Sequence, residues 1–157
     1  MVILYKKILL ALDESADSKR AIEKVIDFYQ RFHSEIVVFH TFSTVVVPQI
    51  NIGIMNMNYY PTRLQATAQI IATRKVAGEH LLKATEKIFK KHSVPVTLRL
   101  VEDESPDEYI LDAIEHEGFD LVILGCEGHH SKLRRIIYDT VPDKVLNSAP
   151  ADILIVR

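Results

Sequence analysis

The chain has 157 residues, a formal net charge of −2 and 48% hydrophobic residues. A chain of this length suits one domain that buries about 70% of the surface exposed by its unfolded form. The small net charge gives no electrostatic reason to expect nucleic acid or an anionic membrane as a partner. The single cysteine, Cys126, excludes an internal disulfide and is typical of a protein in a reducing cytoplasm.

Two stretches near the start of the chain have the apolar character of targeting or membrane-spanning segments. In the first, Lys6 and Lys7 interrupt the apolar run and no small-residue cleavage site follows, so we expect a strand rather than a signal peptide. The second lies between Glu35 and Arg63 and has no charged residue, but it contains prolines and asparagines that hydrocarbon would leave poorly satisfied. We therefore expect a cytoplasmic protein with no membrane partner.

Short apolar runs predict five strands. Continuous runs of this kind are typical of strands that are covered on both faces. A proline near the start of the third run indicates an edge strand, because proline cannot donate to a sheet. The expected strands are Ile8–Leu12, Ile36–Phe39, Val94–Val101, Leu121–Leu124 and Ala151–Val156.

Helical spacing and capping residues predict the connections between these strands. Ser15 is suited to cap a helix that runs to about Arg31, and Thr62 to His92 would form a helix about 45 Å long. In that long helix, Gly78 indicates either a bend or a close contact.

The later helices carry equally clear signals. Ser105 and Pro106 begin a helix that stops at Gly118. Pro142 fits only a first turn, so another helix should start at Asp139 or Thr140.

The alternation of strands and helices predicts an α/β fold. We expect residues 1–157 to form a single doubly wound domain, a five-stranded parallel sheet with helices on both faces. In such sheets ligands bind at the carboxyl ends of the strands, where the strand order reverses. The candidate loops hold Asp13, after the first strand, and Gly125 to His130, after the fourth. A strand that enters a glycine-containing turn before a helix is typical of anion sites.

The chain resembles the universal stress protein family over essentially its whole length. The resemblance rests on ALDES after the first strand, the Pro106 helix followed by FDLVILG, the pair Gly125-x-x-Gly128, and the closing VLNSAPADILIVR. It implies a Rossmann-like sheet with strand order 3-2-1-4-5 and a role in stress response. It also implies a homodimer, and the apolar last strand at a sheet edge is suited to form it. One branch of the family binds ATP through Gly-x-x-Gly, nine residues and then Gly-Ser or Gly-Thr, and another branch lacks the motif and does not bind ATP.

The resemblance implies an adenine nucleotide, ATP or AMP, between the two candidate loops. The implied contacts are Ala11, Leu12, Asp13, Val38, Gly125, Gly128, His129, Asp139, Thr140 and Val141.

Two positions depart from the family pattern for phosphate. Tyr138 stands where the family has glycine, and Asp139 stands where it has serine or threonine. Two like charges at 4 Å repel by about 1 kcal/mol in water and about 4 kcal/mol at an intermediate dielectric. We expect triphosphate binding to be impaired. A third departure, Glu104 in place of the usual glycine, predicts a differently shaped loop at the sheet edge.

Other chemistry has weaker support. Cys126, His129 and His130 are metal-ligand types, but a site needs three or four ligands in fixed geometry and no fourth is near in sequence, so we expect no metal. No residue is assigned a catalytic role. We expect a nucleotide-binding regulator rather than an enzyme. One alternative is a nucleotide hydrolase or transferase on the same fold, with the Asp139 carboxylate as the candidate general base or metal ligand. The other is a ligand-free dimeric interaction module.

One long connection remains without an assigned role. Residues 45–60 are uncharged and rich in isoleucine, methionine and asparagine. A connection of this length is often functional. Two interpretations are open, a mobile flap over the ligand cleft or partner subunit, and a cover for the long helix.

Overall fold

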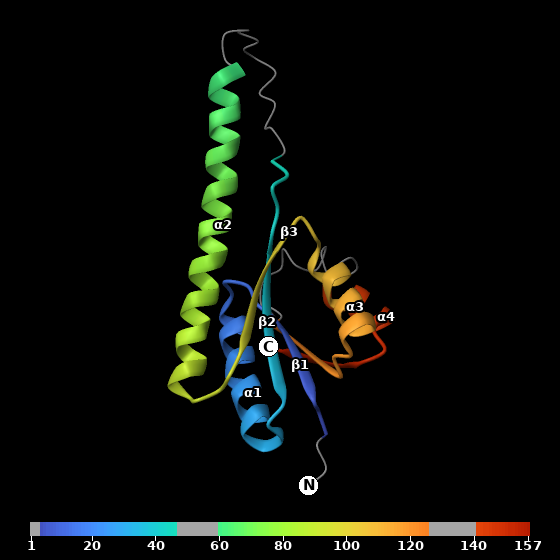
Figure 1. Cartoon of the computed structure of the whole chain (residues 1–157). Coiled ribbons are helices and arrows are strands. Elements are labelled where there is room, and N and C mark those ends of the chain that lie inside the picture. Colours follow the sequence, from blue (N-terminus) through green and yellow to red (C-terminus); the bar gives the residue numbers. More distant parts are fainter. Residues whose placement is uncertain (1–3, 47–59, 126–140) are drawn as a thin grey trace.

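The computed structural model describes residues 4–46, 60–125 and 141–157 of the chain (Figure 1). The predictions for Gly128, His129, Asp139 and Thr140, and the interpretation of the connection over positions 47–59, fall outside these residues. The strands are β1 (Lys7–Ala11), β2 (Glu35–Phe42), β3 (Thr97–Glu102), β4 (Leu121–Gly125) and β5 (Asp152–Val156). The helices are α1 (Ala16–Phe32), α2 (Tyr60–Lys91), α3 (Pro106–Glu117) and α4 (Val141–Ser148).

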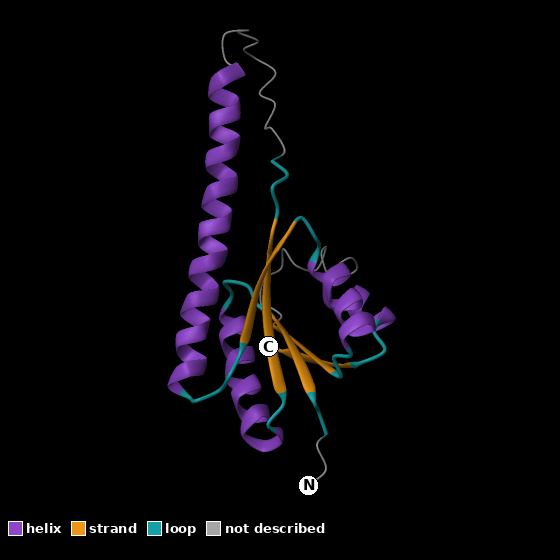
Figure 2. Cartoon of the chain, viewed as in Figure 1, coloured by secondary structure: helices purple, strands orange, loops and turns teal. Residues whose placement is uncertain are grey.

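The five strands form one parallel sheet in the order β3-β2-β1-β4-β5, as expected (Figure 2). The central strand β1 pairs with β2 on one side, Ile8 opposite Ile36, and with β4 on the other, Ile8 opposite Leu121. The strand order reverses between β1 and β4, so the switch point lies where the sequence placed it. The third strand, β3, is at one edge as expected, and β5 is at the other.

Helices cover both faces of this sheet. One core cluster joins α1 and α2 to the sheet around Leu10, Val38 and Ile123. The second joins α3 and α4 to the other face around Leu9, Val37 and Val122. Successive residues of a strand point to opposite faces, so these neighbouring residues belong to different clusters. This arrangement explains why the inner strands are continuously apolar rather than alternating.

The helix boundaries follow the predicted capping chemistry in most places. Ser15 caps α1, with its Oγ accepting the N–H of Ser18 at 3.1 Å. Gly118 ends α3 in the left-handed region at φ 72°, which glycine adopts without steric cost. Ser105 occupies the N-cap position of α3, but its hydroxyl donates to the Glu108 carboxylate at 2.8 Å instead of capping the backbone.

The third strand begins later than the sequence indicated. It starts at Thr97 rather than Val94, because the Val94 N–H donates to the Phe89 carbonyl and closes the end of α2. Pro95 has no N–H to contribute to the sheet. The second strand, in contrast, continues three residues past Phe39 and ends at Phe42.

The second helix is much longer than the sheet is tall. Its 32 residues span about 48 Å, whereas the 8 residues of β2 span about 26 Å. The later half packs on the sheet through Leu82, Thr85 and Phe89. Within positions 63–77 no residue is buried, and Leu64 is 73% exposed. Figure 1 shows this earlier half projecting past the carboxyl ends of the strands.

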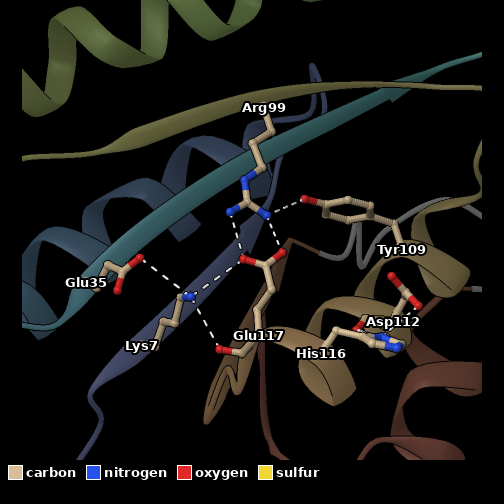
Figure 3. A network of polar contacts seen from close by, with 7 residues as sticks. All are labelled: Lys7, Glu35, Arg99, Tyr109, Asp112, His116 and Glu117. Carbon is tan, nitrogen blue, oxygen red and sulfur yellow. Dashed lines mark hydrogen bonds and ion pairs between the residues drawn. The ribbon is translucent and has the colours of Figure 1, made fainter.

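Polar side chains tie the amino end of the sheet together (Figure 3). Arg99 on β3 makes a bidentate ion pair with Glu117 at the end of α3, at 2.6 and 2.8 Å, and also donates to the Tyr109 hydroxyl at 2.9 Å. Lys7 on β1 lies 3.6 Å from the carboxylates of both Glu117 and Glu35. The guanidinium holds the pKa of the Glu117 carboxyl below its usual range, because it donates to the ionised form. The network therefore connects β3, β2 and β1 to α3.

Candidate functional site

The loop after β1 is folded by its own side chains. The Asp13 N–H donates to the Ser18 Oγ at 2.8 Å, and the Ser15 N–H donates to the Asp13 Oδ1 at 2.8 Å. An aspartate that accepts the N–H two residues later forms a compact turn. The Asp13 side chain is exposed at the carboxyl end of the sheet, and its Oδ2 makes no hydrogen bond with any described residue. This oxygen can accept a hydrogen bond from a ligand hydroxyl or amine.

Gly125, the last residue of β4, lies directly against this loop. A Cβ built on Gly125 would stand 2.7 Å from the Ser18 backbone nitrogen and 2.8 Å from the Asp17 carbonyl carbon. Real Cβ atoms do not approach backbone this closely, so only glycine allows α1 to begin here. The structure thus places Gly125, the first residue of the second candidate loop, against the first turn of α1, which follows the Asp13 loop.

The first turn of α1 also holds a buried carboxylate. Asp17 is only 2% exposed, pairs with Arg20, and leaves its Oδ2 without a partner among the described residues. A negative charge in the first turn of a helix is favoured by the helix dipole. Because the backbone of this turn contacts Gly125, a carboxylate here opposes the binding of a dense anion nearby unless Arg20 remains paired with it.

The other predicted contacts lie at different depths. Ala11 ends β1 and is half-buried, and Leu12 follows it with a buried side chain. Val38 lies deepest. Its side chain is 0% exposed within the core beneath α1 and α2, because it points to the same face as Leu10 and lies four residues before the end of β2. The contact of Val38 with a ligand stays a prediction.

The far side of the candidate site is described only in part. Val141 is the first described residue after Gly125, and it opens α4, with Pro142 in the first turn as expected. Within the described ranges, no three metal-ligating side chains gather closely enough to hold a metal ion. No helix in those ranges has the length and apolarity needed to cross a bilayer.

Sequence reasoning did not find a depression at the carboxyl ends of β2 and β3. It has a volume of about 410 Å³, and its described lining includes none of Ala11, Leu12, Asp13, Val38 and Gly125. Its lining residues are Thr41, Phe42, Ser43, Val45, Asp103, Glu104, Ser105 and Pro106. Asp103 closes one side, in the left-handed region at φ 56°, and both its carboxylate oxygens accept hydrogen bonds from Thr44. These bonds lower the pKa of the Asp103 carboxyl.

His40 is another feature near the candidate site to which the sequence assigned no role. It stands near the end of β2, and its Nδ1 lies 2.7 Å from the Leu12 carbonyl oxygen, one residue before Asp13. Apart from the adjacent His129 and His130, the histidines are scattered in the sequence, and only the pairing of β1 with β2 shows that His40 reaches Leu12.

Comparison with known proteins agrees with this fold and places the chain in a family. The model of the universal stress protein family matches residues 4–157. The chain belongs to the universal stress protein family. A Staphylococcus haemolyticus protein named as a universal stress protein is 25% identical over 157 residues, which is 99% of this chain and 87% of that protein.

Solved structures of universal stress proteins share the same architecture. UspA from Lactobacillus plantarum superimposes with a TM-score of 0.73 at 17% identity, covering 98% of each chain. A family protein from Arabidopsis thaliana, solved with AMP bound, superimposes with a TM-score of 0.58 at 13% identity, covering 96% of this chain and 90% of its own. At these identities the likeness establishes the fold of this universal stress protein.

Proposed function

We propose that this universal stress protein binds an adenine nucleotide at the carboxyl end of its sheet, between the Asp13 loop and the segment that follows Gly125. The contact between Gly125 and the first turn of α1 carries the proposal, because it puts the end of β4 beside the turn that follows Asp13, where the strand order reverses. Asp13 stands exposed beside this junction with one carboxylate oxygen unpaired among the described residues. The AMP bound to the Arabidopsis protein supports the same class of ligand.

The phosphate half of the proposed cleft favours a short phosphate chain. Tyr138 and Asp139 replace the small residues of the family pattern, and Asp17 adds a carboxylate to the first turn of α1, whose backbone contacts Gly125. Each added phosphate brings more negative charge toward these carboxylates, and a favourable helix terminus returns only about 0.3–1 kcal/mol. We therefore propose that AMP binds at least as tightly as ATP.

Calorimetric titration of the purified chain with AMP, ADP and ATP, each with and without Mg²⁺, tests this proposal. We expect comparable or tighter binding for AMP. The double variant Tyr138→Gly with Asp139→Ser restores the family pattern and should tighten ATP binding while leaving AMP binding nearly unchanged. ATP binding far more tightly than AMP in the unaltered chain would contradict our interpretation of these two positions.

The same titration separates the alternative functions. Release of phosphate or ADP from ATP during the experiment would indicate a hydrolase or transferase. Absence of binding for all three nucleotides would indicate a ligand-free interaction module. Binding without turnover is what we propose, for a regulator in the cytoplasm whose nucleotide occupancy alters its contacts with partners.

We further propose that two copies pair through β5. This strand lies at a sheet edge, and its apolar residues Ile153, Leu154 and Ile155 are only half-buried within one copy. Exposed apolar edges invite pairing with another strand, and a two-fold axis would satisfy both copies at once. Light scattering should give the mass of a dimer, and Leu154→Pro should give monomers or misfolded protein. A monomer at every concentration would end this proposal.

A further inference from the structure

The backbone of Leu12 is held at two points by β2. Its N–H donates to the Phe39 carbonyl at 3.0 Å, which extends the ladder one residue beyond β1. Its carbonyl accepts a hydrogen bond from His40 Nδ1 at 2.7 Å. The next residue, Asp13, already directs its N–H to Ser18 in α1. The Leu12 carbonyl is therefore the point where the sheet ends and the Asp13 loop begins.

The contact also determines which ring nitrogen of His40 carries a hydrogen. A carbonyl oxygen can only accept, so Nδ1 carries a hydrogen. In the neutral ring, Nε2 is then an acceptor, and it makes no hydrogen bond with any described residue. The imidazole thus donates to the Leu12 carbonyl at the point where the backbone ladder between β1 and β2 ends.

Gly78 provides the space in which this ring lies. A Cβ at position 78 would stand 2.8 Å from Leu100 Cδ1 and 3.0 Å from His40 Cδ2. Glycine inside a helix costs about 0.5–1 kcal/mol relative to alanine, so α2 has a specific reason to carry one here. The reason is close contact with the His40 ring and β3, which settles the two interpretations that the sequence left open for Gly78.

We propose that His40 is a positioning residue of the nucleotide cleft, which holds the Leu12 carbonyl and thereby the direction in which the Asp13 loop leaves the sheet. The ring lies between that carbonyl and α2, so displacement of α2 at Gly78 moves the ring and is transmitted to the loop. The inference rests on the proposed function, because a positioned Asp13 matters only if the cleft takes a nucleotide.

Backbone NMR of the ligand-free protein tests the positioning step by itself. His40→Ala removes the donor and should shift the amide signals of the Asp13 loop. His40→Asn places an amide donor at the same distance from the backbone as Nδ1 and should restore them. His80→Asn is the matched control, because His80 is exposed on α2 and should leave those signals unchanged. Gly78→Ala should shift both the loop amides and the ring nitrogens of His40.

Calorimetry with AMP then tests the consequence for binding. Loss of one hydrogen bond that orients the loop should weaken AMP binding about fivefold to tenfold in His40→Ala. His40→Asn should recover most of that loss, and His80→Asn should match the unaltered chain. Thermal unfolding of each variant shows that the comparison is made between folded proteins.

The outcomes separate this inference from the proposed function. Loop amides that do not move in folded His40→Ala overturn the positioning role, whatever the ligand. Loop amides that move while AMP affinity stays within about twofold also overturn it as a role in binding. If the unaltered chain binds no AMP, the proposed function fails, and the NMR result alone decides whether His40 positions the loop.

Discussion

The amino end of the sheet and the Asp13 loop at its carboxyl end are held by different kinds of bonds. At the amino end, the hydrogen bonds join segments far apart in sequence, because Lys7 donates to the Glu117 carbonyl and the backbones of Lys6 and Lys7 donate to Asp120. Tyr5 donates to Asp152, which is 147 residues away. In the Asp13 loop, Asp13, Ser15 and Ser18 bond to one another, over 2 to 5 residues.

The difference indicates that the two regions of this domain contribute to different properties, one to stability and the other to ligand binding. Long-range bonds exist only when the whole sheet is assembled, so the amino end contributes to global stability. A loop that is folded by its own side chains can change without opening the sheet, which suits a ligand site. We therefore expect substitutions at the amino end to lower stability and substitutions in the Asp13 loop to affect binding.

The largest effect is expected where the carboxyl end is also tightly packed. Gly125→Ala should lower the free energy of unfolding by about 1–3 kcal/mol, because the new Cβ would overlap the backbone of α1. Gly118→Asn is a suitable control, since no atom lies within 4 Å of a Cβ there and asparagine tolerates the left-handed region. Urea unfolding measures both variants, and equal stability for Gly125→Ala and the unaltered chain would show that the loop gives way.

A smaller and pH-dependent effect is expected at the amino end. Glu117→Gln should lower the free energy of unfolding by about 1–2 kcal/mol at pH 7, because the bidentate pair with Arg99 loses its charge. The folded-state pKa of Glu117 is depressed, so its contribution is present above the unfolded pKa of about 4.3 and is lost as the pH falls through the folded value. The difference between the two proteins should therefore shrink in acid.

Urea unfolding at several pH values between neutral and acid measures this prediction. Glu35→Gln is the matched control, because Glu35 contacts the same Lys7 with a 60% exposed side chain and should change stability by less than about 0.5 kcal/mol. A Glu117→Gln deficit that stays constant with pH would mean that packing, rather than charge, is what the carboxylate contributes.

The smallest effect on stability, with the clearest effect on binding, is expected for Asp13→Asn. Asparagine keeps the oxygen that accepts the Ser15 N–H, so the free energy of unfolding should change by less than about 0.5 kcal/mol. Loss of the charge at the unpaired oxygen should weaken AMP binding about tenfold. Glu14→Gln, an exposed neighbour, should change neither quantity, and calorimetry with AMP distinguishes the two variants.

The fold could be predicted from the sequence because each element carries its own local signal. The apolar runs Leu121–Leu124 and Ile36–Phe39 lie inside β4 and β2, and Ser15 and Gly118 bound their helices as expected. The alternation of strands and helices predicted a parallel sheet, and the family resemblance implied the strand order that sets the switch point. The length of α2 was also predicted, but not that its first half would project, because that depends on the height of the sheet beside it.

The candidate site could be predicted only where residues are close in sequence. Asp13 and Gly125 follow directly from strand ends, so their loops could be named in advance. The contacts of His40 with Leu12 and of Gly78 with His40 depend on how β2 and α2 pack, and no local pattern reports that packing. The depth of Val38 in the core likewise depends on how α1 and α2 pack on β2, and its contact with a ligand stays a prediction.

Gly125 has a consequence for motif searches across the family. The backbone of α1 presses on this position whether or not a ligand is present, so selection for folding alone would preserve the glycine. A family member that ceased to bind nucleotide should therefore lose glycine at the position of Tyr138 long before it loses glycine at the position of Gly125. Aligned members with measured affinities would test this order of loss. The first glycine of the motif thus indicates the fold, and the later positions are the ones that indicate whether a ligand binds.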